Sequence, residues 1–173
     1  PVPDIEVIKL VQCVPPEPNQ PAESTRVLPG STVEFVITIQ NWGNTALDVS
    51  IDDVLSPVAP ATITPIWGSC AIDTNAPGII VDFCTQFESA LMNSTFPLAI
   101  GTLQPADYCE TGLGEQFVFT FLAQVSPPAS DPTFCDDEID AQNLISVTGE
   151  VIVDPILAPN QPSPDSPNAN SEE

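Results

Sequence analysis

Two segments of the chain alternate apolar and polar residues with a period of two, and this feature restricts the fold most. In residues 32–40 one parity is apolar throughout, with Val33, Phe35, Ile37 and Ile39. In residues 116–125 one parity is likewise apolar, with Phe117, Phe119, Phe121, Ala123 and Val125. Because successive side chains of a strand point to opposite faces, both segments are predicted to be strands with one buried face.

The other strand candidates are shorter or less regular, and proline-rich segments separate them. Residues 5–13 are predicted to form the first strand, residues 46–55 an inner strand and residues 143–153 the last strand. Weaker β segments are expected near 61–67, 78–83 and 96–103. Seven or eight such strands predict an all-β fold, an Ig-like antiparallel β-sandwich over residues 1–154. Residues 155–173 are expected to be a proline-rich, acidic linker.

The charge balance excludes whole classes of partner and of chemistry. The chain has 24 acidic residues, two basic ones and no histidine, which gives a formal net charge of −22. Such a charge repels phosphate backbones and anionic membranes, so no nucleic acid and no membrane insertion are expected. The lack of histidine removes Ser-His-Asp and Cys-His catalysis, and we expect no enzymatic activity. No apolar run is long enough to cross a bilayer.

The five cysteines indicate disulfides and an oxidising compartment, because none stands in the closely spaced pairs typical of zinc sites. Cys70 and Cys84 flank a segment that is expected to be a hairpin with its turn at 75–78, and they are the first predicted disulfide. Cys109 with Cys135 is the second, which leaves Cys13 over. Pairings that involve Cys13 stay open. An extracellular or cell-surface location follows as an expectation.

Six short motifs in sequence order give the chain a resemblance to a known family. They occur at 5–9, 29–35, 41–43, 49–55, 101–105 and 143–148, and include Pro-Gly-Ser-Thr-Val-Glu-Phe, Asn-Trp-Gly, Gly-Thr-Leu-Gln-Pro and Asn-Leu-Ile-Ser-Val-Thr. This order resembles the Ig-like repeats of bacterial and archaeal surface proteins known as domain of unknown function eleven. The resemblance implies tandem stalk, cell-wall or adhesive repeats without a shared enzymatic activity. The long segment between Trp67 and Phe96 departs from the family pattern.

Three polar residues fall on the apolar faces of predicted strands. Lys9, the only lysine, shares the buried parity of residues 5–13, Asp53 that of residues 46–55, and Asn143 that of the last strand. An unpaired amine or carboxylate in a dry core costs several kcal/mol, so these groups are expected to meet partners.

These three groups are also the set required for an intramolecular isopeptide bond. Burial lowers the pKa of Lys9 and yields a neutral nucleophilic amine, while a protonated Asp53 polarises the amide of Asn143. The set is similar to that of isopeptide-forming pilin and adhesin domains of the collagen-adhesin type. Two other interpretations stay open: a buried Lys9–Asp53 ion pair without a crosslink, and a Lys9 that reaches solvent at the sheet edge.

Other candidate sites have simpler explanations. Acidic residues gather at Asp131, Asp136, Asp137, Glu138 and Asp140, and oxygen ligands suit calcium, but a solvated charge run is more common in so acidic a chain. Calcium is therefore the only cofactor left open. Asn93 begins a glycosylation sequon, Asn-Ser-Thr. Trp42 and Trp67 are candidates for a sugar-binding face or for ordinary packing.

The sequence thus predicts a structural or adhesive module of a larger surface protein, in contact with neighbouring repeats or subunits of one assembly. One alternative is a calcium-dependent module that binds carbohydrate or protein. Another is a filament subunit that assembles by strand donation.

Overall fold

The computed structural model describes residues 2–22, 25–54, 62–105, 114–126, 139–141 and 144–152. The longer strands are β1 (Ile5–Cys13), β3 (Thr32–Asn41), β4 (Leu47–Val54), β7 (Leu98–Leu103), β8 (Gln116–Ser126) and β10 (Leu144–Val151). The shorter strands are β2 (Thr25–Val27), β5 (Thr62–Pro65), β6 (Ala71–Thr74) and β9 (Ile139–Ala141), and one helix, α1, spans Phe83–Asn93. The predicted linker 155–173 lies outside the described residues.

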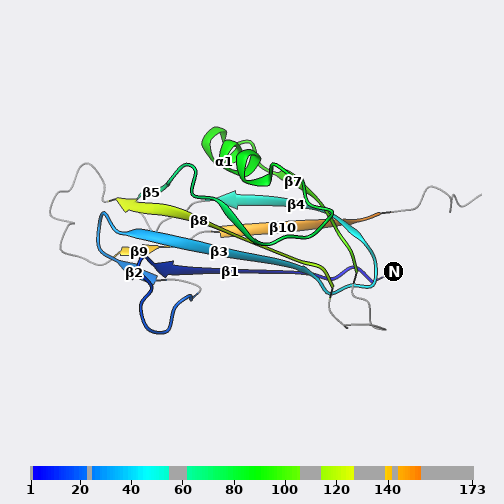
Figure 1. Ribbon diagram of the computed structural model, residues 1–173, viewed down its shortest axis with the longest axis horizontal. Coiled ribbons are helices and arrows are strands. Elements are labelled where there is room, and N and C mark those ends of the chain that lie inside the picture. The colour runs from blue at the N-terminus through cyan, green and yellow to red at the C-terminus, as the bar shows by residue number, and fades with distance from the viewer. Residues whose placement is uncertain are drawn as a thin grey trace, which may run out of the picture.

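Two antiparallel sheets face each other and form a sandwich (Figure 1). One sheet has the order β1-β3-β8-β5, with β6 also paired to β8, and the other has the order β10-β4-β7. Strands β2 and β9 pair separately at one end of the molecule. The predicted all-β sandwich is confirmed, with eight strands in the two facing sheets.

The period-two alternation places the core as expected. The inward residues of β3 and β8 are almost fully buried, and each pair of partners in the register brings two of them together, as with Phe35 and Phe121. In β4 the inward positions include Val49 and Ile51, which are buried, and Asp53 follows with the same parity and 4% exposure. Strand identity and face were therefore readable from the sequence wherever the alternation was regular.

The segment between β6 and β7 differs from the prediction. The expected strand at 78–83 is wrong: only an isolated bridge joins Ile79 to Gly101, and helix α1 begins at Phe83. The expected hairpin between Cys70 and Cys84 is wrong for the same reason. The chain passes close to β7 because Gly78 and Gly101 have no side chains. A Cβ atom on either glycine would lie 2.1 Å from a backbone oxygen of the other segment.

Helix α1 closes one side of the sandwich through aromatic packing. Its buried residues Phe83, Phe87 and Ala90 are spaced at i, i+4 and i+7, which places them on one face of a helix. The ring of Phe87 packs against Phe119 and Phe121 of β8, with centroids 5.0 and 5.3 Å apart. The helix lies over the β7 side of the molecule (Figure 1). It is far too short to span a bilayer, and no other helix occurs within the described ranges.

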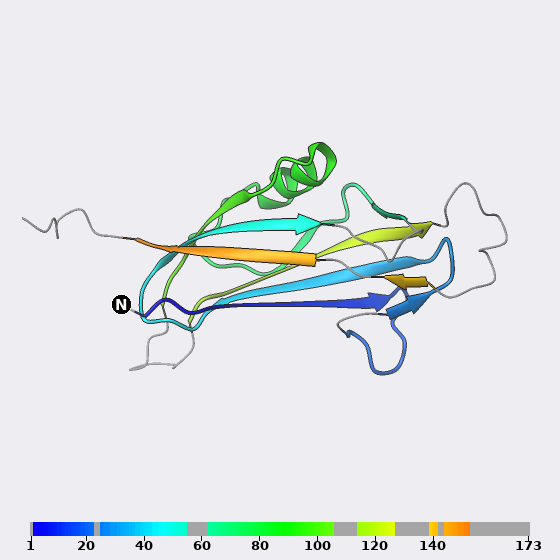
Figure 2. The ribbon, with the colours of Figure 1, turned by 180° about the vertical axis from the view of Figure 1, so that it is seen from behind.

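On the opposite side, the edge strands β1 and β10 of the two sheets come into contact (Figure 2). The two strands run in opposite directions, and the side chain of Ile5 lies over Gly149, where an added Cβ would be 3.5 Å from Ile5 Cδ1. Lys9 stands four residues further along β1, toward the Leu144 end of β10. No helix covers this side among the residues that the structure describes.

Candidate functional site

The amine of Lys9 lies between the two sheets. Strand β1 carries it inward with the parity of Val7 and Val11, and its side chain retains 9% exposure. The ammonium nitrogen also lies 5.2 Å from the ring centroid of Phe35 on the neighbouring strand β3. An aromatic face attracts a cation, so Phe35 partly offsets the loss of water around the amine.

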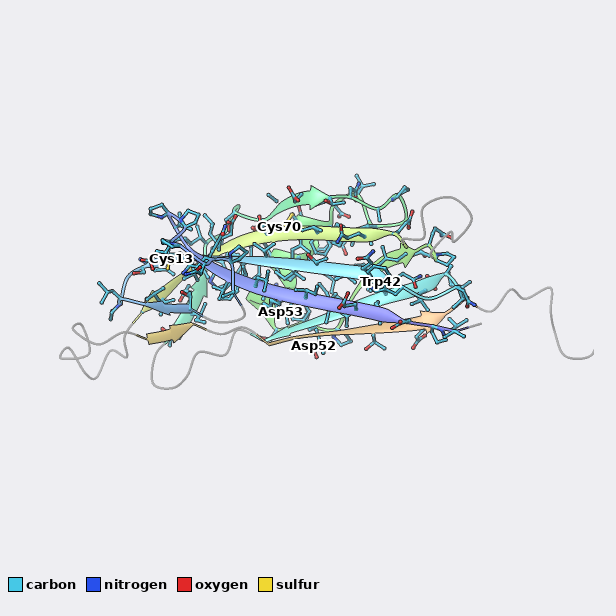
Figure 3. The ribbon with its side chains drawn as sticks, turned by 90° about the horizontal axis from the view of Figure 1, so that it is seen from below. Cys13, Trp42, Asp52, Asp53 and Cys70 are labelled. Carbon is cyan, nitrogen blue, oxygen red and sulfur yellow. A yellow bond between two sulfur atoms is a disulfide. The ribbon has the colours of Figure 1, made fainter. Side chains whose placement is uncertain are left out.

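Asp53 meets this amine from the opposite sheet. Its side chain is fully buried, and Lys9 Nζ donates a hydrogen bond to Asp53 Oδ1 over 3.2 Å. The neighbouring Asp52 points to the other face of β4 and is exposed (Figure 3). The two adjacent acids therefore lie on opposite faces of β4, as the alternation of side chains along a strand requires.

Burial controls the protonation of Lys9. Removal of water lowers the pKa of the amine from 10.5 to about 7, although the charge of Asp53 acts in the opposite direction. Near neutral pH a large share of the amine is therefore uncharged and carries a free lone pair. A neutral amine is the nucleophilic form of lysine.

These contacts distinguish among the three interpretations of Lys9. The exposed, edge-seeking lysine is wrong, because the side chain is buried and bonded to Asp53. The buried Lys9–Asp53 pair is present. Asn143, the third group of the predicted crosslink, lies outside the described residues.

The described part of β10 flanks the pair. In the register of β4 with β10, Asp53 is opposite Ile145, and Val147 is opposite Ile51. The first described residues of β10 therefore pair with the end of β4 that carries Asp53.

The predicted disulfide between Cys70 and Cys84 is present. It joins the start of β6 to the first turn of α1 and ties the helix to the sandwich. Cys13 is not paired with any cysteine that the structure describes, and Gln20 Nε2 donates to its sulfur over 3.3 Å. Cys109 and Cys135 lie outside the described residues, so their pairing stays a prediction.

The remaining predicted sites are described only in part. Asp131, Asp136, Asp137 and Glu138 lie outside the described residues, and of Asp140 only the backbone, in β9, is described. Elsewhere in the described ranges no group of three or more potential metal ligands occurs. Asn93 is exposed at the end of α1, and its amide donates to the carbonyl of Ser89.

Two residues were missed at the sequence level. Phe35 was assigned to the core, but its ring also faces the Lys9 amine. Glu88 of α1 accepts hydrogen bonds from the backbone N–H groups of Gly68 and Cys70. The first was readable from the shared inward parity of adjacent strands. The second required knowledge of the helix.

Comparison with known proteins gives no match to any family model, curated protein or solved structure.

Proposed function

We propose that this chain is a non-enzymatic structural and adhesive module of an extracellular or cell-surface protein, with an internal isopeptide bond between Lys9 and Asn143. The observation that carries the proposal is the buried Lys9–Asp53 contact, 3.2 Å long, next to the start of β10. A buried ion pair stabilises a fold poorly compared with apolar residues of similar size. A reactive role would explain why the chain has this pair in place of apolar residues.

The proposed reaction balances without any cofactor. The neutral amine of Lys9 attacks the side-chain carbonyl carbon of Asn143, and a new C–N bond forms. The protonated Asp53 donates a hydrogen bond to the carbonyl oxygen, and its carboxyl group relays a proton from the attacking nitrogen to the leaving one. The bond between Cγ and Nδ2 of Asn143 breaks, and one ammonia leaves. The reaction occurs once per molecule, so the module is not an enzyme.

The position of the bond suits a load-bearing module. Strands β1 and β10 lie in contact at the edges of opposite sheets. A covalent bond from β1 to the residue before β10 joins the first strand to the last. By the loop-closure estimate used for disulfides, a loop of about 100 residues or more contributes about 5 kcal/mol. Force applied between the segment before Lys9 and the segment after Asn143 is then carried by covalent bonds.

The intact mass of the reduced, denatured protein tests this proposal. The wild-type chain is expected to be lighter than its sequence mass by one ammonia. Asp53→Asn removes the proton relay, and Lys9→Met removes the nucleophile, so both variants are expected at full mass. A full-mass wild-type chain contradicts the proposal. A loss of one water instead indicates direct condensation of Lys9 with Asp53 and also contradicts it.

The extracellular setting is supported by the disulfide chemistry of the chain. The Cys70–Cys84 disulfide persists in oxidising compartments and is rare in reducing ones. The resemblance to surface-protein repeats supports neighbouring repeats or subunits of the same assembly as partners. The net charge of −22 favours solubility at the cell surface.

A second candidate function, assembly by strand donation, is favoured by the open edge of β1. This strand pairs with β3 on one side, while on its other side the described residues contribute only a bridge from Ala22 to Val11. An unpaired edge offers backbone groups to a strand from another subunit. Concentration-dependent polymers that disappear when residues 1–4 or 155–173 are removed would support this function. A chain that stays monomeric at high concentration would exclude it.

A further inference from the structure

A tryptophan stands on an exposed turn between β5 and β6. The turn is closed by a hydrogen bond from Ser69 N to Ile66 O, and Gly68 takes a positive φ of 76°. The side chain of Trp67 is 45% exposed. No described residue accepts a hydrogen bond from its indole N–H, whereas Trp42 donates to Glu6 over 2.8 Å. A large amphipathic side chain is therefore displayed to solvent, with a donor that none of the described residues uses.

Three independent connections hold this turn in place. Both carboxylate oxygens of Glu88 accept from Gly68 N at 2.9 Å, and one of them also accepts from Cys70 N at 3.0 Å. The Cys70–Cys84 disulfide anchors the residue that follows the turn to helix α1. Leu122 N donates to Ser69 Oγ over 2.9 Å. A group that is already ordered loses little entropy on binding, so this geometry favours a recognition role for Trp67.

The indole stands between two hollows. One is a cleft of about 500 Å³, lined by the apolar side chains of Leu91, Met92 and Phe96 and by the acids Asp52 and Asp53. The other, of about 350 Å³, lies between the turn and α1 and includes Met92 and Glu88. Met92 borders both hollows and is 60% exposed. Aromatic and methionine side chains around a cleft are typical of protein-recognition surfaces.

The charges around the cleft select the chemistry of its occupant. Both hollows carry carboxylates, and the whole chain has only two basic residues. One of them, Lys9, is buried in the ion pair with Asp53. A neutral sugar gains nothing from this field, whereas a cationic segment is attracted from a distance and pairs with Asp52 at contact.

We propose that the cleft beside Trp67 binds a cationic segment of a partner protein, with an arginine or lysine side chain over the indole and directed toward Asp52. The cation is attracted by the face of the ring, and the indole N–H donates to a backbone carbonyl of the bound segment. This inference names a partner for the proposed adhesive role. Asp53 also lines the cleft, but the proposed contacts are with Trp67 and Asp52, so the inference does not require the crosslink.

The test uses a capped synthetic peptide of alternating glycine and arginine, and a matched peptide in which citrulline replaces arginine. Calorimetric titration of the full chain at physiological ionic strength is expected to show binding of the arginine peptide alone. Trp67→Ala is expected to weaken binding at least about fivefold, as for loss of one cation–π contact. Trp42→Ala is the matched control and is expected to change affinity less than about twofold.

A second pair of variants keeps the test independent of any effect of Trp67→Ala on folding. Asp52→Asn removes the acid at the cleft, and Asp48→Asn removes an exposed acid from the same face of β4. Both substitutions change the net charge equally, so their long-range effects are the same. Asp52→Asn is expected to weaken binding more than Asp48→Asn, because Asp52, unlike Asp48, lines the cleft. Equal effects within either pair would overturn the proposal, as would binding of the citrulline peptide or no binding at all. Binding of a neutral oligosaccharide such as cellohexaose through Trp67, without arginine binding, would overturn it as well.

Discussion

The two sides of the sandwich are closed by opposite kinds of chemistry. On one side, helix α1 fills the space next to β8 with phenylalanines packed edge to face and is fastened by a disulfide. On the other side, the edge strands β1 and β10 meet, and a lysine and an aspartate come together between the sheets. The aromatic side gains stability from every contact that it makes. The charged side desolvates two ions and gains less.

The two sides differ in whether their packing includes a group that can react. Aromatic packing leaves no reactive group, whereas the Lys9–Asp53 pair keeps a neutral amine in the interior near neutral pH. If stability alone decided, apolar residues would serve better at both positions. The charged side is therefore the side on which a chemical function is expected, and the following variants compare the two.

The largest effect is expected for Lys9→Met. This change leaves Asp53 buried without the amine, which costs about 3–5 kcal/mol. It also abolishes the proposed crosslink and its contribution of about 5 kcal/mol. Urea denaturation measures the loss. Adding Asp53→Leu is expected to recover only the cost of the buried carboxylate and not the contribution of the crosslink. A Lys9→Met, Asp53→Leu double variant that is no more stable than Lys9→Met would contradict this explanation.

Phe87→Ala tests the aromatic side. The ring is fully buried and packs against four other rings, those of Phe83, Phe96, Phe119 and Phe121. Its removal is expected to lower the free energy of unfolding by about 3–5 kcal/mol. Met92→Ala, an exposed position on the same helix, is the control and is expected to cost less than about 0.5 kcal/mol. Similar losses at both positions would show that α1 is not packed as described.

Removal of the disulfide tests how firmly α1 is fastened. The bond joins residues separated by 14 positions, and a loop of this size contributes about 3 kcal/mol. The Cys70→Ser, Cys84→Ser double variant is expected to lose this amount in thermal or urea unfolding. Cys13→Ser is the matched control, because a hydroxyl preserves the contact with Gln20, and it is expected to cost less than about 1 kcal/mol.

The pH dependence of stability gives the smallest but most specific effect. In Asn143→Ala the amine of Lys9 stays free, with its pKa lowered from 10.5 to about 7. Between these two values the unfolded chain binds the proton and the folded chain does not, so stability rises with pH by at most about 1.4 kcal/mol per unit. In the crosslinked wild-type protein the amide has no such proton, and this rise is absent.

The Asn143→Ala, Lys9→Met double variant supplies the background from the carboxylates and other groups. The free energy of unfolding of this double variant, measured between about pH 7.5 and pH 9.5, is subtracted from that of Asn143→Ala at each pH. A difference that does not change over this window would mean that Lys9 titrates near its ordinary pKa in the folded protein.

Sequence patterns were sufficient for the strands but not for the helix. Strand β1 was predicted with the bounds that the structure has, and β3, β4 and β8 differ by one or two residues, because alternation identifies both the strand and its face. Residues 78–83 were predicted as a strand, and no helix was predicted for the residues that follow. There the spacing of Phe83, Phe87 and Ala90 was the available sign of a helix, but an eleven-residue helix within a β-rich chain gives a weak periodic signal.

For the candidate site, the sequence patterns likewise predicted which side chains are buried but not how the strands are ordered around them. Parity alone brought Lys9 and Asp53 to the same interior, because each lies on a regularly alternating strand. Which sheet carries each residue, and how the aromatic ring of Phe35 meets the amine, depend on strand order across the sandwich. The turn of Trp67 was not predicted as a rigid feature, because it depends on Glu88 from a helix that the sequence did not reveal.

The crosslink is tested most directly by tandem mass spectrometry of the reduced, alkylated protein after cleavage with a glutamate-specific protease. Cleavage after Glu6 and Glu23, and after Glu138 and Glu150, releases residues 7–23 and 139–150. We expect one branched species that contains both peptides, less one ammonia, with fragment ions that join Lys9 to Asn143. Two separate peptides at full mass, with the Lys9 amine free to react with an acylating reagent, would contradict it.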